Sequence, residues 1–502
     1  MEAPTWTGSP AGAAGRAFRP HPAWNRRPSM SEPDDYIHDV TYPAQFHREM
    51  TPAWIDAVSR GLGHAMPDIA QPFRWCELGC GTGLNSLVAA ATHPRAEFVA
   101  IDANAHHVDQ ARAAATAAGL RNLRVIRAGF DAWDGPEGEP LEPFDAIVTH
   151  GVLSWISRPQ RQAFFRFVAR FLRPGGIVYA HYMTHPGLSA AAAAQHLARR
   201  YGETLAGSSA ERARHGLAFL SRLSEAGAGF YAAYPQEKLR LASAARQDGD
   251  ALAHELLTAG WEPFHVATMM EEFAAAGCTY RGSATPTDNI DAVSLPAATR
   301  PLLAGIQAPS VAETVRDMAR NQSLRRDLYQ RGGGPLSPAR HMEALGALAL
   351  AALPGAPSGG QDLRFDTPIG RVSGDRALFG PILDALAQAP RTVAELARLP
   401  GFSPHPAMLN QAVQMLLWSA CAHPVARALP DPAAAWALNR HLARDGGPGW
   451  LVAPALGTAL PATAEAMAMA RAALESPAAE VSPGMRALRD RWTAFGVLPP
   501  QR

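Results

Sequence analysis

Between residues 36 and 185, short apolar runs alternate with longer segments whose apolar residues recur at helical spacing. The short runs are rich in Val, Ile and Phe and predict buried strands at 73–79, 96–102, 123–129, 143–151 and 175–183. The longer segments predict helices at 51–66, 83–93, 106–120 and 161–172. Because strands that alternate with helices form parallel sheets covered on both faces, this part predicts an α/β fold with a Rossmann-like doubly wound sheet.

The alternation stops near residue 187, and helical patterns take its place. Segments 188–205, 209–227 and 237–257 predict a mostly helical middle domain. Further short helices at 380–390, 392–399 and 405–420 predict a helical, winged-helix-like C-terminal domain. Gly- and Pro-rich stretches mark the boundaries between these parts. The predicted domains are a disordered leader at 1–30, a cofactor-binding domain at 31–187, the middle domain at 188–335, a linker at 336–361 and the C-terminal domain at 362–502.

Composition excludes several classes of partner. Lys and Arg number 46 against 45 acidic residues, and 405–420 holds neither Lys nor Arg, so we expect a packing module there and no nucleic-acid partner. The four cysteines form neither a disulfide framework nor a metal-binding motif, which indicates a reducing compartment and no metal. No apolar run is long enough to span a membrane. We therefore expect a cytoplasmic protein without membrane insertion.

The stretch "WCELGCGTGLNSL" at 75–87 places three glycines directly behind a predicted strand. Gly79, Gly81 and Gly83 allow the backbone to approach a ligand closely, as in nucleotide-binding turns. A dinucleotide fingerprint requires a small residue where this chain has Leu84, which disfavours a pyrophosphate. Glu77 would repel a phosphate but favours a cation, so a sulfonium or an amino group suits the loop better.

Two later acidic positions complete a nucleoside-type pattern. Asp102 ends the next predicted strand about 20 residues downstream, where an acid is expected to accept hydrogen bonds from ribose hydroxyls. Phe130 and Asp131 follow the third predicted strand, where an aromatic ring and an acceptor can meet an adenine.

Together these residues resemble the class I S-adenosylmethionine-dependent methyltransferases. The matching motifs are "ELGCGTG", "AID", "GFD", "FDAIVTHGVLSWI" and "LRPGGIVYAHY". The resemblance implies that S-adenosyl-L-methionine is the cofactor, with Glu77, Gly79 and Gly81 at its methionine portion, Asp102 at the ribose and Asp131 at the adenine. The full set of implied cofactor-binding residues is Glu77, Gly79, Gly81, Gly83, Asp102, Ala103, Phe130, Asp131 and His150.

A narrower resemblance extends over most of the chain. "YIHDVTYPAQFHREMTP", "HGVLSWIS", the helical middle region and "LVAPALGTAL" are similar to bacterial methyltransferases with a methyltransferase regulatory domain. That group includes rickettsial protein-lysine methyltransferases that act on an outer-membrane protein. The resemblance implies a protein substrate and a lysine acceptor. At 36–39 the chain reads Tyr-Ile-His-Asp, which is less acidic than in many members and leaves the substrate contacts there open.

Three residues are candidates for catalysis. His150, directly after the fourth predicted strand, is expected to face the methyl group, with Trp155 as a wall. Tyr42, together with His47, is expected to close over the site as a lid. The alternative is that His150 only hydrogen-bonds the loop, that Trp155 fills the core and that the Tyr42 segment is a surface hairpin.

Other functions remain open at this point. A small-molecule methyltransferase would keep the same cofactor, and a non-catalytic scaffold would keep only the fold. An NAD-dependent dehydrogenase is disfavoured by Leu84. A homodimer is also an open alternative.

Overall fold

The structure, a computed structural model, describes residues 37, 39–40, 42–134, 141–402, 406–426, 429–444 and 446–501. The leader predicted at 1–30 lies outside this range. All the described residues belong to one compact unit, Asp35–Arg502.

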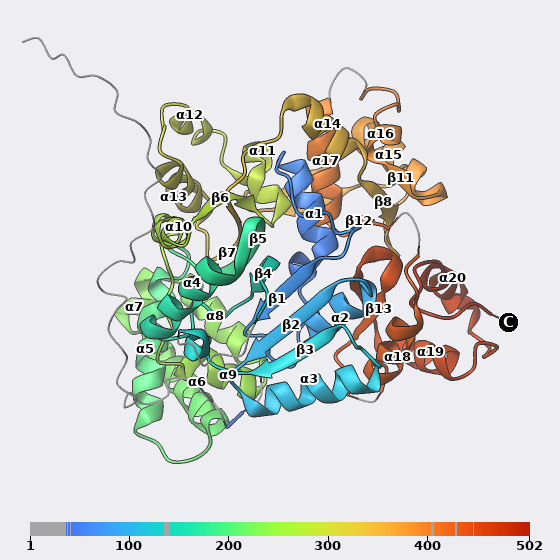
Figure 1. Ribbon diagram of the computed structural model, residues 1–502. Coiled ribbons are helices and arrows are strands. Elements are labelled where there is room, and N and C mark those ends of the chain that lie inside the picture. The colour runs from blue at the N-terminus through green and yellow to red at the C-terminus, as the bar shows by residue number, and fades with distance from the viewer. Residues whose placement is uncertain are drawn as a thin grey trace, which may run out of the picture. The chain divides into compact units, whose positions relative to one another are not determined.

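A seven-stranded sheet with the order β3-β2-β1-β4-β5-β7-β6 forms the centre (Figure 1). Its strands are β1 Arg74–Leu78, β2 Glu97–Asp102, β3 Leu123–Arg127, β4 Phe144–Thr149, β5 Leu172–Met183, β6 Cys278–Ser283 and β7 Leu324–Arg331. Strands β1 to β5 are parallel, β7 runs antiparallel to β5, and β6 runs antiparallel to β7. The strand order reverses between β1 and β4, which confirms the predicted Rossmann-like doubly wound sheet.

Helices cover both faces of this sheet. The first four are α1 Pro52–Gly61, α2 Leu84–Thr92, α3 Ala105–Ala117 and α4 Arg158–Phe171. Helices α1, α2 and α3 pack on one face and α4 on the other, because alternate residues of each buried strand point to opposite faces. Local signals set the helix starts: the side chain of Thr51 caps α1 and that of Asn104 caps α3.

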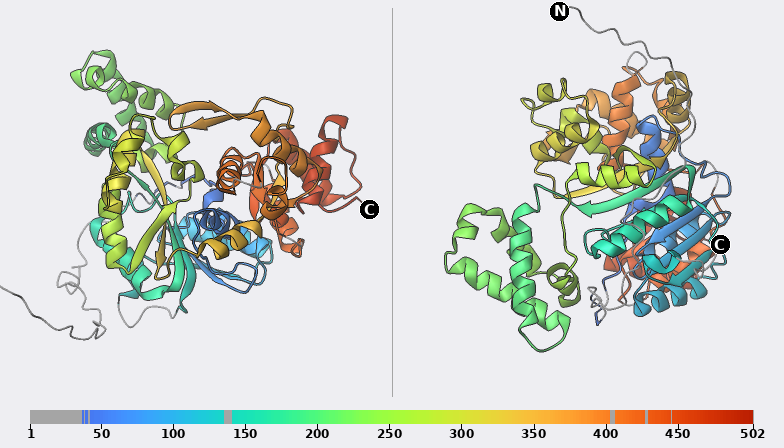
Figure 2. Two further views of the ribbon diagram at one scale, coloured as in Figure 1. Left: turned by 90° about the horizontal axis from the view of Figure 1, so that it is seen from above. Right: turned by 60° about the vertical axis from the view of Figure 1, so that its left-hand side comes forward.

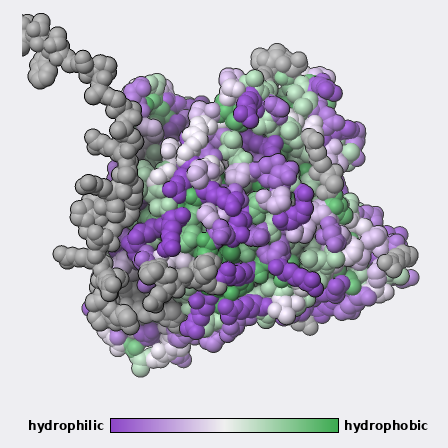
Figure 3. Space-filling view, in the orientation of Figure 1, coloured by the Kyte–Doolittle hydropathy of each residue, from purple (hydrophilic) through white to green (hydrophobic). Residues whose placement is uncertain are grey.

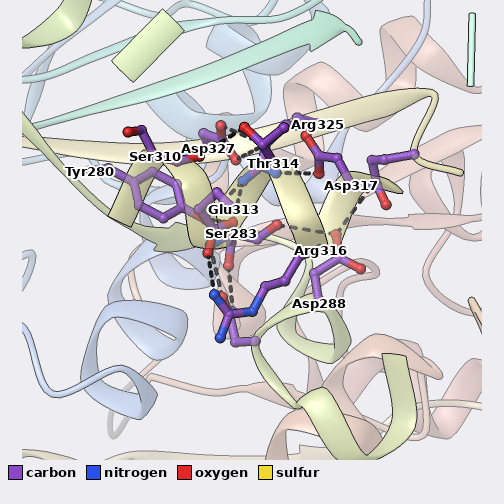
Figure 4. A network of polar contacts seen from close by, with 12 residues as sticks. Tyr280, Ser283, Asp288, Ser310, Glu313, Thr314, Arg316, Asp317, Arg325 and Asp327 are labelled. Carbon is purple, nitrogen blue, oxygen red and sulfur yellow. Dashed lines mark hydrogen bonds and ion pairs between the residues drawn. The ribbon is translucent and has the colours of Figure 1, made fainter. Parts of the chain in front are cut away.

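Strands β6 and β7 lie inside the range for which the sequence predicts helices. They are accompanied by α10 Val266–Ala275, α11 Asp291–Ser294, α12 Arg300–Leu303 and α13 Pro309–Arg320. The reason for the difference is that β7 reads "LRRDLYQR", which has neither an apolar run nor a clean alternation. The buried Arg325 of β7 pairs with acids of α13 and with Tyr280 of β6 (Figure 4).

The rest of the middle region is helical, as predicted. It comprises α5 Ser189–Glu203, α6 Ser209–Glu225, α7 Gly229–Ala233, α8 Gln236–Ala244 and α9 Gly249–Leu257. Figure 2 shows these helices, in green, gathered beside the sheet rather than on its faces. A small apolar cluster of its own, including Leu217 and Leu252, holds α6 against α9.

The C-terminal third consists of short helices and small antiparallel sheets. Its helices are α14 Pro338–Gly346, α15 Arg376–Gln388, α16 Val393–Leu396, α17 Pro406–Trp418, α18 Ala433–Leu442, α19 Ala464–Glu475 and α20 Arg486–Ala494. Its strands are β8 Ala349–Ala352, β9 Arg364–Thr367, β10 Gly370–Ser373, β11 Arg391–Thr392, β12 Ala422–Pro424, β13 Trp450–Ala453 and β14 Thr458–Pro461. The winged-helix detail stays a prediction, as do the domain boundaries.

This third shares its core with the cofactor-binding part. One apolar cluster joins Leu87 and Val88 of α2 to Leu438, Leu451 and Leu456 of the C-terminal third. Removing the C-terminal third would therefore expose the helix that follows the glycine loop.

No helix in the described ranges has the length and apolar character needed to cross a lipid bilayer. The face of the molecule in Figure 3 mixes hydrophilic and hydrophobic residues.

Candidate active site

The glycine loop turns sharply between β1 and α2. Gly79, Gly81 and Gly83 have φ values of 74°, 54° and 77°, a left-handed region that favours glycine. A Cβ on Gly79 would lie 2.3 Å from the Val152 side chain, and one on Gly83 would lie 2.8 Å from the Cβ of Ala111. A Cβ on Gly81 would meet nothing within 4 Å. Gly79 and Gly83 therefore permit close packing, whereas Gly81 faces open space.

Asp102, at the end of β2, connects the loop to α3. One oxygen of its carboxylate accepts from the Gly81 N–H at 2.8 Å, and the other accepts from the Asn104 N–H at 2.9 Å. The side chain is buried. Nδ1 of His107 lies 3.3 Å from Oδ1 as a third donor. A carboxylate offers about four lone-pair positions, so capacity remains for a further donor such as a ribose hydroxyl.

Glu77 lies in β1 beneath the loop and is buried. The Ser86 hydroxyl, in the first turn of α2, donates a hydrogen bond to its carboxylate. Burial raises the pKa of Glu77 to about 8, even though the Ser86 contact acts in the opposite direction. A cation placed beside Glu77 would favour its ionised form.

The residues predicted to meet an adenine differ in exposure. Ala103 and Asp131 are exposed. Phe130 is buried in the apolar core, with its ring edge-on to Phe164 at 6.1 Å between centroids. The loop after β3 therefore offers a ligand the carboxylate of Asp131 more readily than the ring of Phe130.

Two buried donors in the loops after β2 and β4 have no hydrogen-bond partner among the described residues. They are the side-chain amide of Asn104 and the indole N–H of Trp155. Buried polar groups are normally paired, so both donors are available to an acceptor on a bound molecule or to water. Together with the open space at Gly81, these donors fit a nucleoside-type cofactor.

Three imidazole rings stack in a row at the end of β4. His150 lies between His47 and His181, with ring centroids 3.5 Å and 3.9 Å away and planes within 12° and 4° of parallel. Nδ1 of His150 is 2.9 Å from the hydroxyl of Tyr179 in β5. Burial lowers the pKa of His47 to about 4 and holds those of His150 and His181 well below the ordinary value. The row is therefore neutral at pH 7.

The other two catalytic candidates meet at a separate contact. The ring of Tyr42 packs edge-on against Trp155 at 5.3 Å and against His254 of α9 at 5.4 Å. Among the described residues, no ring contact or hydrogen bond joins Tyr42 to His150. The structure thus brings His150 together with His47, and Tyr42 together with Trp155.

Several residues that shape this edge were missed by the sequence analysis. Asn85 exchanges two hydrogen bonds with the backbone of His47, His107 binds the backbone of Tyr42, and Tyr179 faces His150. The partners of Asn85 and His107 lie 38 and 65 residues away in sequence, so local patterns carry no signal for them. By contrast, Tyr182 points to the other face, where its hydroxyl donates to Asp327.

Within the described part of the chain, no group of three or more His, Cys, Asp or Glu residues is arranged to hold a metal ion.

Two family models match the chain. Residues 76–176 match a methyltransferase domain, and residues 248–331 match a family described as a predicted methyltransferase regulatory domain. The first match holds the glycine loop, Asp102 and His150. The second holds β6 and β7, so the residues of the regulatory family complete the central sheet.

Similar proteins agree with these matches. An uncharacterised protein of Synechocystis is 32% identical over 369 residues, which are 74% of this chain and 72% of that protein. An uncharacterised protein of Rickettsia prowazekii is 30% identical over 149 residues, which are 30% of this chain and 26% of that protein. The solved structure of PKMT2 from Rickettsia typhi in complex with AdoHcy has a TM-score of 0.65 at 17% identity, and the match covers 86% of this chain and 88% of PKMT2. That likeness shows a shared fold.

Proposed function

The chain belongs to the class I S-adenosylmethionine-dependent methyltransferases that carry a methyltransferase regulatory domain, and on this premise we propose that it methylates lysine side chains of a protein. S-adenosylmethionine is the methyl donor of this class. The lysine acceptor is supported by the motifs that resemble rickettsial protein-lysine methyltransferases and by the fold shared with PKMT2.

The observation that carries the proposal is the neutral row of His47, His150 and His181 beside the glycine loop. A lysine amine has an ordinary pKa near 10.4 and attacks only after losing its proton. Burial disfavours the ammonium form, and the charge of Arg326 opposes a second cation at this point, as it opposes protonation of His150 and His181. Such a site suits an amine that reacts in its neutral form.

We assign the cofactor-binding residues as follows. Glu77 lies at the amino end of the methionine portion, Gly81 provides the space for it, and Gly79 and Gly83 shape the turn. Asp102 binds the ribose, and Ala103 and Asp131 border the adenine. Phe130 supports this loop from the core.

The cofactor supplies a methyl group already activated by its positive sulfur. The chain must align the acceptor and keep water out. We assign His150 to the contact with the acceptor amine, where a ring nitrogen accepts a hydrogen bond from it. Tyr179 fixes the orientation of that ring through the 2.9 Å contact. Tyr42 and Trp155 form a wall over the cofactor.

The test is labelled methyl transfer from S-adenosylmethionine into a host lysate, which is then separated into protein and small molecules. We expect label in protein and, after hydrolysis, in methylated lysine. His150→Ala should abolish the transfer while S-adenosylhomocysteine still binds, and His215→Ala, at an exposed position on α6, serves as the matched control. Label in the small-molecule fraction would show that the acceptor is a metabolite and not a protein. Label in neither fraction would favour a non-catalytic scaffold.

A further inference from the structure

The segment from Tyr42 to His47 lies over the carboxyl ends of the parallel strands, where it contacts residues that follow β1, β2 and β4. It precedes the glycine loop by more than thirty residues in sequence. It has no regular secondary structure, and its bonds at both ends go to side chains of the cofactor-binding part. The N–H of Tyr42 donates to Nε2 of His107 at 3.2 Å. At the other end, His47 and Asn85 exchange hydrogen bonds of 3.1 Å and 2.7 Å.

His107 lies in α3 and is almost fully buried. Because a backbone N–H only donates, Nε2 of His107 must accept from Tyr42, and the ring proton must reside on Nδ1. Nδ1 lies 3.3 Å from Oδ1 of Asp102 and donates to it. One imidazole thus joins the carboxylate assigned to the ribose with the segment that covers the site.

We propose that His107 is a positioning residue that couples cofactor binding at Asp102 to closure of the Tyr42–His47 segment. The inference rests on the proposed role of Asp102 at the ribose. Donation from Nδ1 holds the carboxylate in the orientation in which its remaining lone pair faces the ligand. A ligand that fixes Asp102 also fixes the ring, and a fixed ring holds the N–H of Tyr42.

Coupling of this kind is reciprocal. If the ligand stabilises the closed segment, the closed segment must strengthen ligand binding by the same factor. The segment also carries Tyr42 against Trp155 and His47 against His150, so its closure completes the surroundings of the acceptor. The coupling therefore favours the complete acceptor site when the methyl donor is bound.

Two substitutions separate the two bonds of His107. The amide of His107→Asn reaches the position of Nδ1, so this variant retains the contact with Asp102 and loses the one with Tyr42. The longer His107→Gln reaches the position of Nε2, so it retains the contact with Tyr42 and loses the one with Asp102. His106→Asn, at the exposed neighbouring position, is the matched control.

The probe is S-adenosylhomocysteine, with affinity measured by calorimetry and closure measured by hydrogen exchange of the Tyr42–His47 amides in the full chain. In wild type and His106→Asn we expect the ligand to slow exchange in this segment. His107→Gln should lower the affinity about 10- to 20-fold, the low end of the effect of one lost hydrogen bond to a charged group. His107→Asn should lose the ligand-induced slowing and, because the coupling is reciprocal, should lower the affinity only by the factor by which the ligand slows exchange in wild type.

Several results would overturn the proposal. Exchange in the wild-type segment that does not respond to the ligand would remove the coupling itself. The role of His107 would be reduced to core packing if both variants matched His106→Asn, or if the two variants lost affinity and protection to the same extent as each other. Unfolding of both variants would lead to the same conclusion. A wild-type protein that does not bind S-adenosylhomocysteine would overturn the coupling together with the cofactor. A protein that binds it but labels no lysine would contradict only the proposed acceptor.

Discussion

Strands β4 and β7 belong to one sheet, but the residues they bury differ in kind. In β4 the buried side chains are apolar, among them Phe144, Ile147 and Val148. In β7 the buried side chains include Arg325 and Asp327. The first strand gains its stability from apolar surface removed from water, whereas the second depends on every buried charge finding a partner.

Arg325 has such partners on several elements (Figure 4). Its guanidinium contacts Asp327 in its own strand at 2.9 Å, Asp317 of α13 at 2.5 Å and Glu313 of α13 at 2.8 Å. The hydroxyl of Tyr182, in β5, donates to Asp327. The network therefore ties α13 and β7 to the last parallel strand. The comparison teaches that residues matching the regulatory family are part of the central sheet, where backbone pairing with β5 is accompanied by buried ion pairs to α13.

The largest expected effect comes from breaking this network. Arg325→Met leaves Asp317 and Asp327 buried without their cation, and we expect it to lower the free energy of unfolding by about 3–5 kcal/mol. Denaturant unfolding followed by circular dichroism measures this change. Arg371→Met is the control, since its ion pair with Asp366 in the β9–β10 hairpin is exposed and should leave the unfolding curve unchanged. Equal stability of the two variants would show that β7 is held in some other way.

The parallel strands also bury acids, and the pH dependence of one of them, Glu77, sharpens the comparison. Glu77 has a pKa of about 8 in the folded chain and an ordinary value of 4.5 when unfolded. The folded state therefore binds the proton more tightly. Protonation of Glu77 therefore stabilises the folded state. This contribution is complete below pH 4.5 and is lost as the pH rises through 8.

Between pH 5 and pH 9, we expect wild type to lose about 2–4 kcal/mol more unfolding free energy than Glu77→Gln, because the amide does not ionise. Denaturant unfolding of both proteins at the two pH values measures the difference. Equal losses of unfolding free energy in the two proteins would mean that Glu77 is already ionised in the folded chain, because a cation lies beside it even without the cofactor.

The contrast between β4 and β7 also explains which parts of the fold and of the candidate site could be predicted from the sequence. Strands such as 96–102 are apolar and end in an acid, so the fold and the place of Asp102 at the end of a strand were predictable from local patterns, whereas its role at the ribose stays a prediction. Strand β7 gave no such signal, because pairing with residues of α13 and β5 decides its burial. The histidine row was predictable only in part: His150 follows a strand, but its stacking on His47 depends on a segment about 100 residues earlier folding back over the sheet.

A substitution of Asp102, at the end of β2, tests whether this carboxylate binds the ribose. Asp102→Asn cannot accept from all of its present donors, and we expect S-adenosylhomocysteine affinity to fall by about 1–3 kcal/mol, measured by calorimetry. Asp109→Asn, at an exposed position on α3, should bind as wild type does. Unchanged affinity in Asp102→Asn would remove this residue from the cofactor site.

The smallest effect separates backbone strain from ligand contact within the glycine loop. Gly81 and Gly119 both have positive φ, at 54° and 64°, and a Cβ on either would meet nothing within 4 Å. Gly81→Ala and Gly119→Ala should therefore each lower the free energy of unfolding by about 1 kcal/mol, from backbone strain alone. Gly119 follows α3, outside the loop, so only Gly81→Ala should also weaken S-adenosylhomocysteine binding, because its methyl group occupies the space assigned to the ligand. Calorimetry and denaturant unfolding of the pair separate the two effects, and equal affinities would place the cofactor away from Gly81.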